Sequence, residues 1–243
     1  MPAVTSRPNQ IVELTRGLDL PLIAIDKEHL EVIAEVIGEA WQYLLQQQPQ
    51  TLANGSEPEI SALLATRLNG LLDQHVLWRQ LVRSVTRGSE MISFNGAHLE
   101  KRPDLSIHLS GRNPSFPLVV ECKIVDAPSR RGVDTYCDSG LNRFLVGEYA
   151  WPAREAFMLA YVRDGTSIAS ALSPFFSKSL TKRPAPYAIE QMPNALAIAN
   201  VDGAQSRHSR SFKYVLEAPS NQDPGTISVW HLWVVAAAKQ VRG

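Results

Sequence analysis

The run from Leu118 to Val125, LVVECKIV, constrains the fold of this chain more than any other segment. Its apolar residues are typical of a strand buried in a sheet, yet a glutamate and a lysine lie at its centre. A buried charge is costly unless it is paired or binds a metal. Nowhere else in the chain does an acidic residue stand two positions before a lysine. We therefore expect the chemistry of this protein at Glu121 and Lys123.

Successive side chains of a strand point to opposite faces, so Glu121 and Lys123 share one face while Cys122 points into the core. Asp104 opens an earlier segment, ending at Leu109, in which apolar and polar residues alternate. If the two strands pair, Asp104 lies beside Glu121. These two carboxylates and the carbonyl of Cys122 then form an all-oxygen site that suits Mg²⁺ or Mn²⁺.

A divalent cation at such a site polarises a phosphoryl oxygen and lowers the pKa of bound water. Lys123 would then orient or deprotonate the attacking water and offset the charge that develops on the phosphoryl group. The predicted reaction is the hydrolysis of a phosphodiester. The alternative is a cross-strand ion pair on a solvated sheet face, because an acidic residue two before a lysine arises by chance about once in a chain of this length.

The size and charge of the chain narrow the function only in part. Its 243 residues, 44% hydrophobic and 20% charged, suit one large globular domain or a domain with an appendage. Basic and acidic residues both number 24, which argues against a broad basic coat for nucleic acid. The composition is still compatible with a local basic groove, because 17 of the 24 basic residues are arginines. The planar guanidinium of arginine can donate two hydrogen bonds to one phosphate.

The location is predicted from what the sequence lacks. No run of about 18 apolar residues is present, so no transmembrane helix is expected. The first ten residues are polar and unlike a secretory signal. Two cysteines make neither a disulfide framework nor a zinc-type spacing. We expect a cytoplasmic protein without a membrane partner.

The periodicity of apolar residues predicts an α/β core in the order helix, three strands, helix, strand. An extra helix precedes this core and a C-terminal extension follows it, so we expect a helical extension over 1–56 and the main domain over 57–243. Helices are predicted over 28–48, 57 to about 76, 138–149 and 168–180, and strands over 89–94, 104–109, 118–125, 157–162, 211–217 and 226–235. Residues 1–27 carry little signal, 49–56 read as a linker and 126–136 as a polar loop.

Pro103 and Asp104, followed by Glu121, Cys122 and Lys123 in this element order, resemble the PD-(D/E)XK nuclease superfamily, which has the restriction-endonuclease-like fold. The resemblance covers roughly residues 57–162. It implies that the aspartate and the glutamate bind Mg²⁺ or Mn²⁺ and that the lysine serves the attacking water.

The resemblance also implies a glutamate on the helix before the first strand. Glu57 and Glu59 both fit this position, and Glu39 on the earlier helix is an outside candidate. On the helix after the third strand the family often has a polar or cationic residue, for which Arg143 is the candidate. Arg143 would contact a phosphate or the glutamate, and the alternative is an exposed helix arginine.

Other cations near the motif are candidates for binding nucleic acid. Arg130 and Arg131 follow the Glu121 strand directly. The segment from Ser206 to Arg210 resembles the basic, histidine-containing stretches of some restriction-like defence proteins, so His208 is a further candidate. The alternative for His208 is a solvated loop histidine.

The leading prediction is a metal-dependent endonuclease that acts on nucleic acid, with DNA favoured, in a bacterial or phage-defence context implied by the resemblance. The first alternative is a catalytically inactive subunit of the same fold that binds nucleic acid or joins a larger complex. The intact set of Asp104, Glu121 and Lys123 argues against it. The second alternative is an RNase or a nuclease toxin. The sequence is compatible with a homodimer or with a partner subunit.

Overall fold

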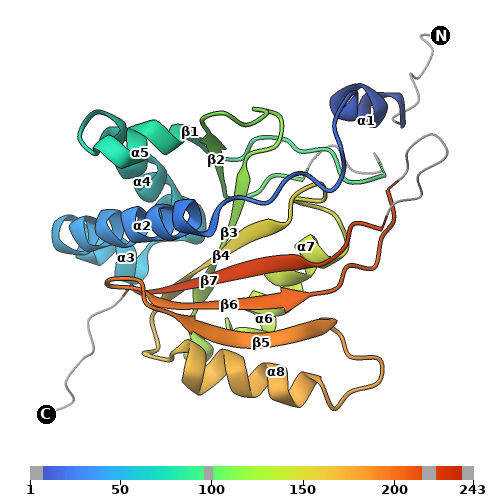
Figure 1. The fold of residues 1–243 in the computed structure, drawn as a ribbon. Helices are drawn as coiled ribbons and strands as arrows, with labels where there is room; N and C mark the ends of the chain where they lie inside the picture. The colour runs from blue at the N-terminus through green and yellow to red at the C-terminus, as the bar shows by residue number, and fades with distance from the viewer. Residues whose placement is uncertain (1–7, 96–100, 215–222, 237–243) are drawn as a thin grey trace, which may run out of the picture.

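The computed structural model describes residues 8–95, 101–214 and 223–236 (Figure 1). Within these residues the centre of the protein is a mixed sheet of seven strands in the order β1-β2-β3-β4-β7-β6-β5. The strands are β1 (Val82–Thr86), β2 (Leu105–Leu109), β3 (Leu118–Val125), β4 (Glu155–Val162), β5 (Ile189–Leu196), β6 (Asp202–His208) and β7 (Ile227–Val235). The predicted α/β class is confirmed.

The middle of the sheet is parallel and its two sides are antiparallel. Strands β3, β4 and β7 run parallel, whereas β1 and β2 on one side and β6 and β5 on the other pair antiparallel. Every residue of β3 and β4 is buried. Helices on both faces of a parallel sheet have this effect, which explains the continuous apolar runs of these two strands.

One face of the sheet is covered by α2 (Lys27–Gln47), α3 (Pro49–Asn54), α4 (Glu57–Gly70) and α5 (Val76–Leu81), on the left in Figure 1. The ring of Trp41 on α2 stacks on Tyr161 with 5.1 Å between centroids, and its Nε1 donates to the carbonyl of Val235 at 2.8 Å. Cys122 belongs to the same hydrophobic core. The helix predicted in the N-terminal extension therefore packs directly on the sheet.

The opposite face is covered by a helical segment after β3 and by a second one after β4. The first comprises a 3₁₀ turn (Ala127–Ser129), α6 (Val133–Tyr136), a π-helical turn (Cys137–Leu141) and α7 (Asn142–Leu145). The second comprises a π-helical turn (Ile168–Leu172) and α8 (Ser173–Ser179), at the bottom of Figure 1. Their apolar side chains form a second core with Val119 and Val125. The face that carries Glu121 and Lys123 is therefore also enclosed.

Several predicted boundaries are wrong. The first strand lies at 82–86 rather than 89–94, where the structure has only an isolated bridge at Met91. The helix from Glu57 ends at Gly70 and is followed by a 3₁₀ turn (Leu71–Asp73) and α5. Helices α1 (Pro8–Thr15) and α3 lie in segments read as featureless or as a linker, and α6 begins inside the predicted loop.

The C-terminal part holds the largest difference from the prediction. Strands β5 and β6 were not predicted, and 211–214 hold no strand, while 215–217 lie outside the described residues. The buried residues of β6 are Gly203, Ala204, Ser206 and His208, which are small or polar and carry no apolar signal. The strand predicted over 226–235 is confirmed as β7.

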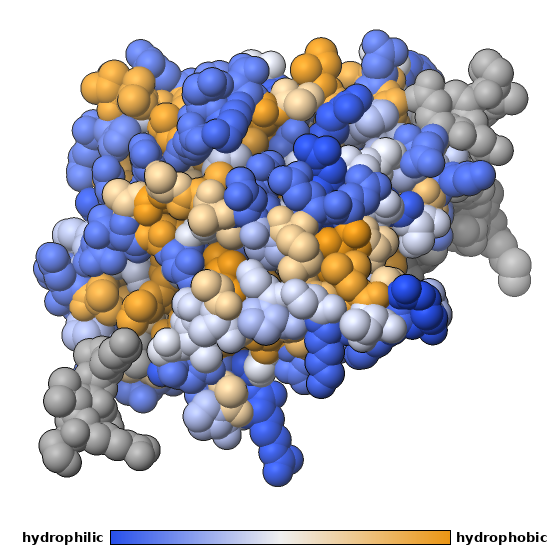
Figure 2. All heavy atoms as spheres, turned by 60° about the horizontal axis from the view of Figure 1, so that its bottom comes forward, coloured by the Kyte–Doolittle hydropathy of each residue, from blue (hydrophilic) through white to orange (hydrophobic). Residues whose placement is uncertain are grey.

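The face turned forward in Figure 2 mixes hydrophilic and hydrophobic residues, with the apolar ones in separate patches. This face does not by itself indicate a partner. Across the described ranges of the chain, the structure has no helix with the length and apolarity needed to cross a membrane.

Candidate functional site

The site forms where β2 and β3 stop pairing. The two strands are paired only over Leu105–Ile107 and Leu118–Val120. Pro103 lies two residues before β2, and its ring nitrogen has no proton to give to a sheet ladder. Beyond Val120, the edge of β3 that faces β2 therefore needs other partners for its backbone groups.

Carboxylates take over this open edge of β3. The backbone N–H of Cys122 donates to Oδ2 of Asp104 at 2.8 Å. Two residues further, the N–H of Ile124 donates to Oε2 of Glu57 at 3.1 Å. Glu57 is the first residue of α4, so the N-terminal end of that helix lies beside the edge of the strand. The strand edge thus positions two carboxylates next to one another.

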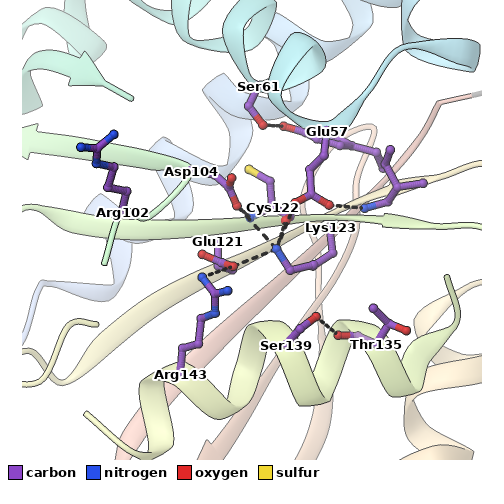
Figure 3. Close-up of polar contacts among 12 residues, drawn as sticks. Glu57, Ser61, Arg102, Asp104, Glu121, Cys122, Lys123, Thr135, Ser139 and Arg143 are labelled. Atoms are coloured by element: carbon purple, nitrogen blue, oxygen red, sulfur yellow. Dashed lines mark hydrogen bonds and ion pairs between the residues drawn. The ribbon is translucent and has the colours of Figure 1, made fainter. Parts of the chain in front are cut away.

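Four groups meet at the ammonium of Lys123, as Figure 3 shows. Its Nζ lies 2.7 Å from the carbonyl of Cys122 and 2.8 Å from Oε1 of Glu121. It lies 3.1 Å from Oε1 of Glu57 and 3.7 Å from Oδ2 of Asp104. We refer to Glu57, Asp104, Glu121 and Lys123 as the Lys123 cluster.

Burial and the neighbouring charges shift the pKa values of the groups in the cluster. Glu121 is 1% exposed and Lys123 is 9% exposed. Burial raises the pKa of Glu121 to about 7, although Lys123 opposes the shift. Burial likewise raises the pKa of Asp104 above its ordinary value, against the charge of Lys123. Burial lowers the pKa of Lys123, but Glu121, Asp104 and Glu57 together outweigh it, so the pKa of Lys123 is raised. A buried ion pair on an enclosed face replaces the solvated pair considered as an alternative.

Arg143 reaches the cluster from α7, on the side of the sheet opposite to α4 (Figure 3). Its Nη1 lies 3.3 Å from Oε1 of Glu121 and donates at 2.7 Å to the hydroxyl of Tyr149. Tyr149 in turn donates to the carbonyl of Arg102 at 2.8 Å. Arg143 therefore contacts Glu121. Its predicted contact with a phosphate stays a prediction.

The predicted helix glutamates separate clearly in the structure. Glu57 lies in the Lys123 cluster, whereas Glu59 accepts hydrogen bonds from the backbone N–H and the hydroxyl of Ser56 in a capping box at the start of α4. Glu39, the outside candidate, is not in the cluster, and its Oε2 lies 3.9 Å from Nε2 of His75. Capping explains why an acidic residue stands three positions after Ser56 without any part in the site.

The remaining candidates lie away from the cluster. Arg130 and Arg131 are exposed in the turn after β3, and the structure gives neither a hydrogen bond nor an ion pair with any member of the cluster. The prediction that His208 lies in a polar loop open to nucleic acid is wrong. His208 is the last residue of β6 and is fully buried.

His208 is buried because both of its ring nitrogens have partners. Nε2 lies 2.7 Å from the hydroxyl of Ser206, and Nδ1 lies 2.8 Å from the carbonyl of Tyr187. The Ser206 hydroxyl also lies 2.7 Å from Nε2 of His231, whose Nδ1 lies 2.8 Å from the hydroxyl of Tyr136. Burial lowers the pKa of His208 to about 4 and that of His231 to about 3. These neutral histidines belong to the core.

The oxygens of the cluster fit a hard divalent cation. Among the described residues, the buried Oε2 of Glu121 finds no hydrogen-bond partner, which leaves an acceptor that a cation would satisfy. Asp104, Glu121 and the carbonyl of Cys122 supply oxygen donors of the kind that Mg²⁺ and Mn²⁺ prefer. In the part of the chain that the structure describes, no group of three or more His, Cys, Asp and Glu residues is arranged as a metal site. The carboxylates of the cluster converge instead on the Lys123 ammonium.

Sequence reasoning missed Tyr149 as a member of the site. Its only signal is the glycine at 147, which is typical of a helix end and says nothing about what Tyr149 contacts.

Comparison of the chain with protein-family models, with curated proteins and with solved structures gives no match.

Proposed function

We propose that this protein is a metal-dependent nuclease of the PD-(D/E)XK type that hydrolyses phosphodiester bonds. The observation that carries the proposal is the convergence of Glu57, Asp104 and Glu121 on Lys123 where β2 and β3 separate. Oε2 of Glu121, which is buried and has no hydrogen-bond partner within the described ranges, adds to it. A purely structural ion pair has no need of three carboxylates around one ammonium, because burying extra charge is costly.

Asp104, Glu121 and the carbonyl of Cys122 would hold the Mg²⁺ or Mn²⁺ ion. When bound, such an ion polarises a phosphoryl oxygen and acidifies a water molecule. Because Lys123 donates to Glu121 and to the carbonyl of Cys122, its ammonium would share these oxygens with a bound ion. Glu57, which also bonds the backbone of Ile124, keeps an acceptor for that ammonium beside the site.

Lys123 serves as a cationic donor in the proposed reaction. In the metal-free protein the surrounding carboxylates raise the pKa of Lys123, so its ammonium is protonated there. A protonated lysine orients the attacking water and offsets the negative charge on the phosphoryl group. The other predicted role, taking the proton of the water, would need the ammonium to lose its proton when a cation binds the same carboxylates.

DNA is the favoured substrate and a bacterial or phage-defence setting the favoured context, both on the strength of the resemblance alone. The test is to incubate the protein with plasmid, linear duplex, single-stranded DNA and RNA, in Mg²⁺, in Mn²⁺ and in EDTA. Cleavage that needs the metal and prefers one substrate supports the proposal. Full activity in EDTA contradicts it.

Variants make this test specific to the site. Lys123→Met keeps the length of the side chain and removes the charge, so cleavage should fall at least about a hundredfold, as for other groups that stabilise charge in a transition state. Lys27→Met is the matched control, because Lys27 is an exposed lysine paired with Glu31 on α2. Equal cleavage by both variants would remove Lys123 from the mechanism. Binding of nucleic acid by the wild type without cleavage would instead favour the inactive subunit.

A further inference from the structure

Tyr149 lies at the centre of a short hydrogen-bond chain next to the Lys123 cluster. Its side chain is buried, with 1% of the residue exposed. The hydroxyl accepts a hydrogen bond from Nη1 of Arg143 and donates its single proton to the carbonyl of Arg102. Burial, together with the charge of Glu121, raises the pKa of Tyr149 to about 12, so the hydroxyl keeps the proton that it donates.

The end of α7 brings Tyr149 back against Arg143. Gly147 has a φ of +76°, and the N–H of Glu148 bonds the carbonyl of Arg143 at 2.9 Å. A Cβ at 147 would come within 2.7 Å of the ring of Phe94, so the tight reversal requires glycine. As a result the guanidinium lies 5.4 Å from the centre of the Tyr149 ring.

The same reversal fixes the segment that leads into β2. Glu148 lies 3.0 Å from Nζ of Lys101, and Tyr149 bonds the next residue, Arg102. Arg102 stands two positions before Asp104. Glu148 and Tyr149 therefore hold the segment that leads to Asp104, through Lys101 and Arg102.

Not all hydrogen-bond donors of the Arg143 guanidinium have a partner among the described residues. Nη1 is taken up by Glu121 and Tyr149, while the structure gives Nε and Nη2 no hydrogen bond to the described residues. About a third of the side chain, 34%, is exposed. Resting on the proposed nuclease function, we infer that Tyr149 is a positioning residue that holds the Arg143 guanidinium against Glu121 and leaves its free edge for a phosphate of the substrate. A guanidinium with one edge fixed presents the other as a preformed fork.

Tyr149→Phe tests this inference because it removes the hydroxyl and keeps the ring. The control is Tyr214→Phe, which removes another buried tyrosine hydroxyl that donates to a carbonyl, that of Trp151 at 3.1 Å. Tyr149→Phe should lower kcat/KM on an oligonucleotide about tenfold, as expected for one lost hydrogen bond to a charged group. Tyr214→Phe should change it less than about twofold.

A double-mutant cycle separates positioning from general stability. In an Arg143→Ala background, Tyr149→Phe should have no more effect on cleavage than Tyr214→Phe, because the group that Tyr149 positions is gone. An equal loss with and without Arg143 would overturn the inference. So would wild-type cleavage by Tyr149→Phe.

A spectroscopic measurement keeps the inference independent of cleavage. Rotation about the Cζ–Nη1 bond of Arg143 should be slow in the wild type, where Glu121 and Tyr149 hold Nη1, and faster in Tyr149→Phe. Nitrogen-15 spectra of the arginine side chains, assigned with Arg143→Lys, report this rate. If the wild type cleaves no substrate, the nuclease proposal fails, while an unchanged Arg143 signal in Tyr149→Phe overturns the positioning role itself.

Discussion

Replacing Glu121 with glutamine should stabilise the metal-free protein at alkaline pH. Burial raises the pKa of Glu121 from 4.5 to about 7. The carboxyl group therefore binds its proton more tightly in the folded chain than in the unfolded chain. By linkage, its contribution to stability is fully present below pH 4.5 and is lost as the pH rises through about 7.

The size of the effect follows from the shift in pKa. Subtracting 4.5 from about 7 gives about 2.5 units, and at about 1.36 kcal/mol for each unit the ionised Glu121 costs the folded state about 3 kcal/mol at high pH. Glutamine resembles the neutral acid and does not titrate. The free energy of unfolding of Glu121→Gln relative to wild type should therefore rise by roughly 2 to 3 kcal/mol between about pH 5 and about pH 8.

Urea unfolding in EDTA, followed at several pH values for both proteins, measures this difference. Titrations of the groups that do not interact with Glu121 cancel, since both proteins contain them. Glu35→Gln is the control, because Glu35 is exposed on α2 and its replacement should give a flat difference. A pH-independent difference for Glu121→Gln, or one that falls as the pH rises, would refute the reasoning.

Three further predictions follow from the same contacts. Glu57→Gln should reduce cleavage at least about tenfold with the fold intact, whereas Glu59→Gln, which keeps a side-chain acceptor in the capping box, should leave stability and cleavage nearly unchanged, as denaturation and plasmid assays will show. Lys123→Met should bind Mn²⁺ in calorimetry at least as tightly as the wild type, because its ammonium shares the oxygens offered to the ion, and weaker binding would contradict this. Ser206→Ala should lower the free energy of unfolding by at least about 2 kcal/mol, because two buried imidazoles each lose a partner, while Ser177→Ala on the surface should change it by less than about 0.5 kcal/mol.

Much of the framework could be predicted from local periodicity. The apolar run of β3 and the helical spacing of α2 reflect burial that the sequence itself records, so their bounds differ from the predicted ones by at most a residue. Strand β6 was not predicted because its buried residues are small or polar. His208 was assigned to a polar loop for the same reason, although it is buried at the end of this strand. Polarity predicts exposure only where a buried polar group would lack partners, and Ser206 and Tyr187 supply them.

By itself, the sequence determined that Glu121 and Lys123 share one face of a buried strand, because alternation along a strand is a local property. The tertiary structure alone decided that Glu57 joins them, since both glutamates stand in the first turn of α4 and only one faces the open edge of β3. It also decided that Arg143, already a candidate from the resemblance, meets Glu121 and that Tyr149 lies beside it. Those contacts depend on where β2 leaves β3 and on how the chain turns after α7, and no pattern of spacing encodes either.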